Sequence, residues 1–423
     1  MPRCWPSWSC RDGAGGGAAV NPEPPRLNWH DGNDVRLLEN GAQFFPALFD
    51  AIDGARVSVH LETYIFQPDR AGQALLERLQ AACERGVRLR VVLDGFGSAA
   101  HAELLTARIR AMGGQCRVYR PEPRRLARLV PSRQRLRRLH RKIAMIDGQA
   151  AFLGGINIVD DYTNEGEDEP SLREPRYDYA VCVRGPIVAD VAHALDLLWL
   201  RLNWMRLRRP LRRLREARLR HPGYRANPPC GEVRAALALR DNLRFRRTIE
   251  QSYLNAIDRA QGEVLIACAY FLPGRRLRRA LAAAAARGVR VRLLLQGMAE
   301  YRLQQHATRA LYEELLAHGI EIHEYMPSFL HAKVAVADGY ATVGSSNLDP
   351  FSLLLAREAN VMVDHAPFAA QLRASLEQAI ALRAQPVERQ RLGRRGPWLR
   401  LADALAYTAL RIGVALTGRS SEY

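Results

Sequence analysis

Two copies of one short motif carry the residues of this chain that are best suited to chemistry. Each copy reads His-x-Lys, then four residues, then Asp. An imidazole can act as base, acid or nucleophile near neutral pH, and an ammonium group beside it can bind an anion. The sequence therefore predicts one site built from both copies, which are His140, Lys142 and Asp147, and His331, Lys333 and Asp338.

The lysines are informative because the chain has so few of them. Of its 62 Lys and Arg residues, only Lys142 and Lys333 are lysines. Chance is a poor explanation for two lysines at matching places. The pattern indicates that both positions need a compact ammonium group on a flexible stem, which the planar guanidinium of Arg does not replace.

The residues around each motif predict a strand, a tight turn and a second strand. Short apolar runs, Lys142–Ile146 and Lys333–Ala337, each end at Asp-Gly, a strong hairpin signal. Since residues two apart on a strand share a face, each His and Lys should reach the same anion. Small residues then precede Asn157 and Asn347, which we expect either to contact that anion or to serve only as turn residues.

This pattern resembles the phospholipase D superfamily, whose signature is the paired His-Lys-Asp motif. Within it the chain is most similar to bacterial cardiolipin synthases of the B type, over roughly residues 32–385. One departure is Phe351, where some cardiolipin synthases have Arg. The narrower similarity is carried by residues 177–181, 346–350 and 358–361.

The resemblance implies a transphosphatidylase that joins two phosphatidylglycerols into cardiolipin and releases glycerol. It implies that His140 attacks phosphorus to form a phosphohistidine and that His331 is the acid, although the sequence alone is symmetric between them. It also implies an acidic residue that orients each histidine, for which Asp178 and Glu358 are the candidates. Two lysines and two Asn side chains would stabilise the charged transition state. No metal or other cofactor is implied.

Alternatives remain open at this stage. Asp147 and Asp338 belong to the signature, yet they could only fix turns and strand ends. Hydrolysis of a phosphodiester, as in a phospholipase D or a nuclease, would use the same pair with water as acceptor. A non-catalytic membrane adaptor is a third hypothesis, which the intact motifs disfavour.

Composition limits the partners. The net charge of +18 indicates an anionic partner, either nucleic acid or an anionic membrane. No pattern of stacking aromatic and basic residues is evident, so nucleic acid is the weaker candidate. Seven scattered cysteines indicate a reducing compartment. We expect a monomer, bound peripherally at the cytoplasmic side of a bacterial membrane.

Helical and strand patterns alternate twice along the chain, which predicts an α/β fold of two duplicated phospholipase D-like α/β/α halves. RGVRLRVVLDG at 85–95 recurs as RGVRVRLLLQG at 287–297. Both halves should pack face to face about a pseudo-two-fold axis, with the active site at their interface. The predicted divisions are a disordered segment at 1–31, a first half with a basic linker at 32–215, a second half at 216–385 and a tail at 386–423.

Two basic stretches and the tail are the candidates for membrane contact. Residues 124–141 and 201–220 are rich in Arg, and the second interleaves Arg with Leu. Residues 397–417 are apolar but broken by three charges, which favours an interfacial helix over a membrane span. A helix that docks on the core is the alternative for this tail.

Overall fold

The computed structural model describes residues 27–122, 137–164, 167, 170–207, 227–241, 245–390 and 396–416. Most of the two basic stretches and of the segment predicted to be disordered lie outside these residues. Elements of the first half are β1 (Trp29–Glu39), α1 (Asn40–Asp53), β2 (Ser58–Thr63), α2 (Arg70–Glu84), β3 (Arg88–Asp94), α3 (Ala102–Ala111), β4 (Gln115–Tyr119), β5 (Lys142–Ile146), β6 (Ala150–Gly154), β7 (Tyr179–Arg184) and α4 (Val188–Leu207).

The second half repeats this order with two helices in place of α3, an extra short helix before its last motif-side strand, and further elements at its end. They are β8 (Val233–Arg240), α6 (Thr248–Arg259), β9 (Glu263–Cys268), α7 (Arg275–Ala286), β10 (Arg290–Gln296), α8 (Arg302–Arg309), α9 (Tyr312–Ala317), β11 (Glu321–Tyr325), β12 (Lys333–Ala337), β13 (Tyr340–Gly344), α10 (Pro350–Leu354), β14 (Glu358–Asp364), α11 (Ala366–Arg383), β15 (Ala384–Pro386) and α13 (Pro397–Leu416).

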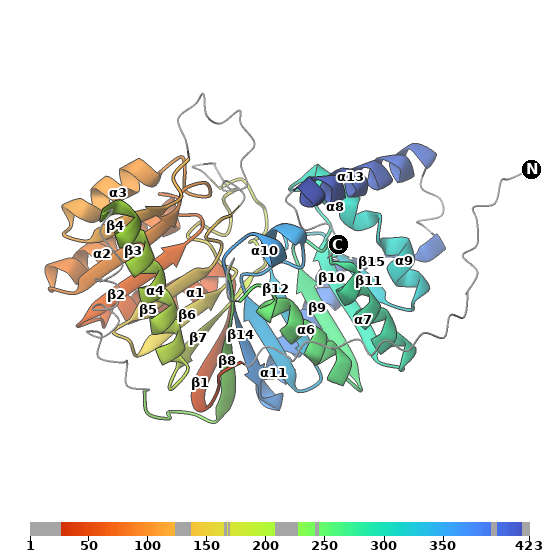
Figure 1. Ribbon diagram of the computed structural model, residues 1–423, viewed down its shortest axis with the longest axis horizontal. Coiled ribbons are helices and arrows are strands. Elements are labelled where there is room, and N and C mark those ends of the chain that lie inside the picture. The colour runs from red at the N-terminus through yellow and green to blue at the C-terminus, as the bar shows by residue number, and fades with distance from the viewer. Residues whose placement is uncertain are drawn as a thin grey trace, which may run out of the picture.

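All described strands form one sheet whose order reveals the duplication. From its centre the order is β1-β7-β6-β5-β2-β3-β4 on one side and β8-β14-β13-β12-β9-β10-β11, then β15, on the other. In each half, three parallel strands joined by helices are followed by antiparallel strands that carry the motif. The predicted α/β fold of two repeated halves is confirmed (Figure 1).

The two halves meet in two ways, of which only one was predicted. At the centre, β1 and β8 pair antiparallel, so the sheet runs continuously from one half into the other. The sequence patterns predict neither strand, and β1 begins at Trp29, inside the segment predicted to lack structure. Gly32 and the neighbouring Asp31 and Asn33 disfavour a strand by propensity, and the register shifts there. The predicted boundary at residue 385 also falls inside β15.

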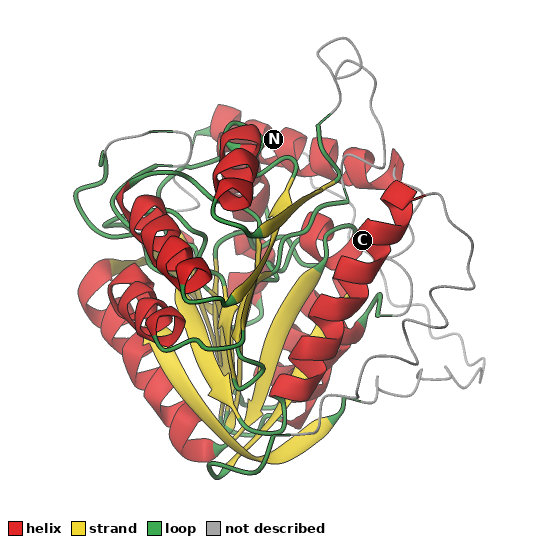
Figure 2. Cartoon of the chain, turned by 90° about the vertical axis from the view of Figure 1, so that its left-hand side faces the viewer, coloured by secondary structure: helices red, strands yellow, loops and turns green. Residues whose placement is uncertain are grey.

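A shared core supplies the second contact between the halves. Buried residues of β5, β6 and β7 join those of β12, β13 and β14 in one apolar cluster, together with α4 and α11. Two further clusters lie under α1 to α3 in the first half and under α6, α7 and α9 in the second. Helices therefore flank the fan of strands on both sides (Figure 2). The shared apolar cluster is the predicted face-to-face contact between the two halves.

The helices begin and bury their faces for local reasons. Asp69 precedes α2 and its carboxylate accepts a hydrogen bond from the Gly72 amide, which satisfies one of the free donors at a helix start. Leu75, Leu76 and Leu79 recur at helical spacing, and all three are almost fully buried. In α7, Leu277, Leu281 and Ala284 also recur at helical spacing and are buried, so this helix too packs one apolar face on the sheet.

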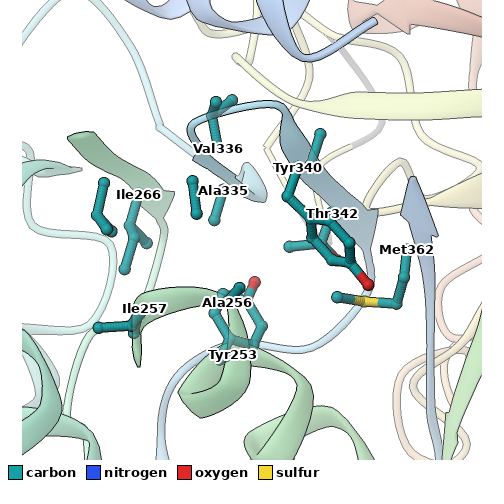
Figure 3. Close-up of a pocket in the computed structure, with 12 residues that line it drawn as sticks. Tyr253, Ala256, Ile257, Ile266, Ala335, Val336, Tyr340, Thr342 and Met362 are labelled. Carbon is teal, nitrogen blue, oxygen red and sulfur yellow. The ribbon is translucent and has the colours of Figure 1, made fainter. Parts of the chain in front are cut away.

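A small pocket in the second half belongs to the core. It lies between α6 and the strands β9, β12, β13 and β14, with an empty volume of about 280 Å³ that includes open solvent. Its lining is apolar apart from Tyr253, Tyr340 and Thr342 (Figure 3). None of the motif histidines, lysines or asparagines lines it, so it reflects imperfect packing under α6.

We predict that buried His60 makes the fold sensitive to acid. Burial, with help from Arg90 and Arg141, lowers the pKa of His60 to about 3. The unfolded chain binds this proton below about pH 6.5, whereas the folded chain does not until about pH 3. Stability contributed by neutral His60 is therefore lost as the pH falls through that window.

Each pH unit in this window costs about 1.4 kcal/mol. When the pH falls from 6.5 to 4.5, the free energy of unfolding should drop in both proteins. The drop in His60→Gln should be about 2–3 kcal/mol smaller than in the unmodified chain. Denaturant unfolding at each pH measures this difference. Parallel stability curves for the two proteins would contradict the prediction.

Candidate active site

The two motifs enter the sheet at equivalent places and are tied to the opposite half. His140 and His331 each lie two residues before the lysine with which β5 or β12 begins. The His140 amide donates to the carbonyl of Arg357, just before β14. In the same way, the His331 amide donates to the carbonyl of Tyr177, just before β7. These crossed backbone contacts bring both histidines to the interface between the halves.

Each histidine pairs with a carboxylate from the other half. The Nδ1 atom of His331 lies 2.6 Å from the Oδ2 atom of Asp178. The Nδ1 atom of His140 lies 2.9 Å from the Oε1 atom of Glu358. Because each Nδ1 is held by an acceptor, each Nε2 is left for chemistry. The structure thus brings together the four residues predicted as histidines and orienting acids.

Both lysines are buried beside their histidines. The Nζ atom of Lys142 donates to the carbonyl of His140 at 2.8 Å, and Lys333 makes the same contact with His331. Lys333 is 1% exposed, and burial lowers its pKa. A buried ammonium group is suited to bind an anion, because the opposite charge offsets the cost of burying its own.

The electrostatics of the two histidines are similar in direction but unequal in extent. Burial is the main cause that lowers the pKa of His140, against the opposing charge of Glu358. Burial, Lys333 and Arg176 lower the pKa of His331 well below its usual value, and His140 contributes to this shift. Burial raises the pKa of Asp178 to about 6. These shifts favour the neutral form of both imidazoles.

Gly155, which follows β6, and Ser345, which follows β13, each fit the carboxylate that pairs with a motif histidine. At Gly155, an added Cβ would lie 2.3 Å from the Oδ1 atom of Asp178. At the matching position, Ser345 instead donates from its hydroxyl to Glu358 at 2.6 Å. The shorter Asp is therefore combined with Gly155 and the longer Glu with Ser345, so the two sides of the site are not identical.

We predict that Gly155→Ala displaces Asp178 and misaligns His331. Misplacing a catalytic group by about 1 Å costs on the order of 100-fold in rate, so activity should fall about 100-fold. Gly54→Ala is the matched control, because Gly54 has a helical φ of −77°. Its nearest neighbour would lie 3.5 Å from the added Cβ. Steady-state rates test both variants, and an active Gly155→Ala protein would contradict the close contact.

The two asparagines are buried near the strand ends. Asn157 accepts a hydrogen bond from the Ile65 amide at 3.4 Å. Asn347 is 3% exposed, and its buried Oδ1 atom has no hydrogen-bond partner among the described residues. An amide group with unsatisfied capacity is costly unless a ligand completes it. The Oδ1 atom accepts hydrogen bonds and so suits a donor such as a ligand hydroxyl, whereas only the Nδ2 group of Asn347 could donate to an anion.

Comparison with known proteins agrees with this geometry. The family described as cardiolipin synthase, phospholipase D-like domain, matches residues 48–170 and 253–380. Cardiolipin synthase B of Escherichia coli (strain K12) is 39% identical over 395 residues, which are 93% of this chain and 91% of that protein. The chain belongs to the phospholipase D-like cardiolipin synthase family.

Further relatives support the same family. Cardiolipin synthase of Geobacillus thermodenitrificans is 33% identical over 336 residues, covering 78% of this chain and 63% of that protein. Among solved structures, phosphatidylserine synthase of Haemophilus influenzae is similar with a TM-score of 0.64 and 15% identity. That match covers 93% of this chain and 97% of the other, and it supports the fold.

The structure corrects one part of the predicted catalytic set. Asp147 and Asp338 lie at the far ends of β5 and β12, about 16 Å along the strand from the lysines at ~3.3 Å per residue. Asp147 accepts hydrogen bonds from the amides of residues 56, 57 and 58, and Asp338 from those of 261, 262 and 263. Both adopt a positive φ at the turn. In this member of the cardiolipin synthase family, Asp147 and Asp338 therefore hold the hairpin turn against the start of the neighbouring strand.

Two residues near the site were missed by the sequence analysis. Tyr64 lies edge-on to His140, with ring centroids 4.7 Å apart, and the Nζ atom of Lys142 is 5.1 Å from the same ring. Arg176 lies two residues before Asp178 and influences His331. Neither residue recurs in the other copy of the family motif, so a search for repeated residues could not find them.

Within the described residues, no group of three or more His, Cys, Asp and Glu side chains is arranged to hold a metal ion. Among those same residues, every helix is too short or too polar to cross a bilayer.

Proposed function

We propose that the protein is a cardiolipin synthase that joins two phosphatidylglycerol molecules and releases glycerol. The observation that carries this proposal is the pair of crossed histidine–carboxylate contacts beside two buried lysines. Relatives named cardiolipin synthase B, similar over nearly their whole length, support this choice of substrate class.

In the first step, the Nε2 atom of His140 attacks the phosphorus of one phosphatidylglycerol. A phosphorus–nitrogen bond forms, and the bond from phosphorus to the headgroup oxygen breaks. The second histidine, His331, gives its Nε2 proton to that oxygen, and glycerol leaves. Binding of the phosphodiester anion would favour the proton on His331, because it adds negative charge to a buried cationic site.

In the second step, the lipid is transferred to the acceptor. His331, now neutral, takes the proton from the terminal hydroxyl of a second phosphatidylglycerol. The freed oxygen attacks phosphorus, the bond to His140 breaks, and cardiolipin leaves. Glu358 and Asp178 keep each imidazole oriented through Nδ1. Lys142, Lys333 and the amides of Asn157 and Asn347 would stabilise the charge on the five-coordinate phosphorus.

Purified protein and phosphatidylglycerol vesicles test the proposal. We expect cardiolipin and glycerol to form in equal amounts, measured by mass spectrometry of the lipids and an assay for glycerol. Phosphatidic acid without cardiolipin would instead indicate the hydrolytic alternative, a phospholipase D. Cleavage of nucleic acid without any lipid product would indicate the nuclease.

We also propose that the protein binds the cytoplasmic side of the membrane peripherally, as a monomer, through α13. One face of this helix packs on the protein: Asp403 lies 2.7 Å from His306 of α8, and Tyr407 accepts a hydrogen bond from Arg278. The opposite face is apolar yet exposed. Its residues, with exposed fractions, are Trp398 80%, Leu401 47%, Leu405 60% and Ile412 56%.

The position of α13 supports this role. Tyr407 and Arg411 line one small pocket with Pro350, which follows Asn347 by only three residues. Figure 1 shows α13 beside α8, at the upper side of the second half. Both alternatives considered for the tail therefore apply, because one face docks on the core while the other is free for lipid.

We predict that Leu405→Glu weakens membrane binding. Burying a leucine in an apolar phase is worth about 1.5–3 kcal/mol, so vesicle binding should fall about 10-fold or more. Val57→Glu is the matched control, since Val57 is 51% exposed but lies at the opposite end of β2 from the site. Sedimentation with anionic vesicles measures both variants. Equal binding by the Leu405→Glu and unmodified proteins would contradict the role of α13.

A further inference from the structure

The proposed reaction brings two anionic phosphates to one site. The phosphorus of the donor is attacked, but the acceptor is also a lipid with a phosphodiester of its own. Three glycerol carbons separate its attacking oxygen from its ester oxygen, so the two phosphorus atoms lie roughly 7 Å apart by ordinary bond lengths. A cation about that far from the reacting centre would therefore hold the acceptor.

Arg176 lies on the His331 side of the site, two residues before the Asp178 that pairs with His331. Residues 177 and 330 form a parallel bridge between the halves, which aligns the segment of Arg176 with that of His331. Residues two apart on an extended segment point to one side, about 7 Å from each other. Since Asp178 contacts His331, Arg176 points to the same side one step further along. Its guanidinium carbon lies 5.5 Å from the ring centroid of Phe329.

The guanidinium of Arg176 has unused hydrogen-bonding capacity. Arg176 is only 8% exposed. Its Nη2 atom donates to the carbonyl of Thr163. Its Nη1 atom lies 3.5 Å from Glu300 but makes no hydrogen bond among the described residues. The carboxylate of Glu300 interacts with both Arg176 and Tyr270, since the Tyr270 hydroxyl donates to it at 2.6 Å. A buried donor left in this way is costly unless a ligand completes it.

The matching place beside His140 differs. Counting back from Asp178 and from Glu358 pairs Arg176 with Ala356, so that segment has no cation there. Arg138, two residues before His140, donates directly to Glu122 at 2.7 Å. Its ion pair is therefore at hydrogen-bond distance, whereas that of Arg176 with Glu300 is longer, at 3.5 Å.

A second difference between the sides is steric. Tyr64 directly follows β2 and places its ring against His140. The residue that directly follows β9 is Ala269, which presents a methyl group at the equivalent position. The equivalence is supported by the bridges of Phe66 with Ile158 and of Phe271 with Leu348. The wall is therefore larger beside His140 than beside His331.

We propose that Arg176 binds the phosphate of the acceptor lipid and so places the acceptor on the His331 side of the site. This inference rests on the proposed function. It makes His331 the group that takes the acceptor's proton, and it explains how a lipid alcohol can be chosen over water. The bound phosphate would also offset the positive charge of Arg176 near His331.

A competition between two acceptors tests the proposal. Labelled phosphatidylglycerol vesicles are given ethanol, and the ratio of cardiolipin to phosphatidylethanol is measured. Both products arise from the same phosphohistidine, so the ratio does not depend on how fast it forms. Loss of a charge-assisted hydrogen bond in Arg176→Gln should lower this ratio about 10- to 100-fold. Arg138→Gln, the matched control, should leave the ratio within about 3-fold of the unmodified protein.

A ratio unchanged in Arg176→Gln, or an equal loss of both products, would overturn the proposal. An equal fall of the ratio in Arg138→Gln would overturn the assignment to the His331 side. If Arg176→Gln does not fold, Glu300→Gln is the test. Removing the carboxylate that competes for Arg176 should raise the ratio of cardiolipin to phosphatidylethanol. An unchanged or lower ratio would overturn the proposal. Unmodified protein that makes phosphatidylethanol but no cardiolipin would refute the proposed function itself, and the acceptor site with it.

Discussion

Replacing His140 with alanine is expected to lower cardiolipin formation by at least about 10⁴-fold, because the proposed nucleophile is lost. Glu358 holds its Nδ1 atom and its ring lies against Tyr64, which leaves Nε2 to attack phosphorus. His318→Ala is the matched control, since this histidine is exposed and its Nδ1 atom contacts the carbonyl of Glu314 in its own helix turn. Initial rates on phosphatidylglycerol vesicles measure the loss.

His331→Ala should lose as much activity on phosphatidylglycerol, but for a different reason. Without the acid, glycerol would have to leave as an alkoxide. A lipid donor with a p-nitrophenyl leaving group needs no proton, so it should restore formation of the phosphohistidine in His331→Ala and not in His140→Ala. Rescue of His140→Ala instead would show that the two roles are reversed. Full activity of either variant on phosphatidylglycerol would refute the mechanism.

Lys333→Arg is expected to lower activity about 100-fold although the charge is kept, because a displaced group costs about that much. Lys333 is 1% exposed and its Nζ atom bonds to the carbonyl of His331. A planar guanidinium is larger and cannot occupy the same space with the same contact. The physical reason is therefore shape and position rather than net charge.

Thermal unfolding separates this effect from a loss of structure. Arg290→Lys serves as the matched exchange at an exposed ion pair with Glu321, and it should leave the rate unchanged within about 2-fold. Lys333→Met removes the charge as well and should be at least as damaging as Lys333→Arg. Wild-type rates in a folded Lys333→Arg protein would contradict the requirement for an ammonium group.

The sequence by itself determined much of the chemistry. Two lysines among 62 basic residues marked both copies of the motif. Local patterns placed His140 and His331 at the starts of strands, since alternation and Asp-Gly turns act over a few residues. The repeated order of helices and strands determined the α/β class. It did not reveal β1 or β8, because their pairing depends on a partner about 200 residues away in the chain.

Only the tertiary structure decided which groups meet. His331 pairs with Asp178, 153 residues away, and His140 with Glu358, 218 residues away, so each acid serves the histidine of the other half. Sequence order would allow the uncrossed pairs equally well, because nothing local records which edges of two similar halves lie together. In the folded protein Asp147 lies away from the site, whereas Arg176 lies near His331. Contacts of this kind follow from long-range packing of the shared core, and a sequence pattern reports only its near neighbours along the chain.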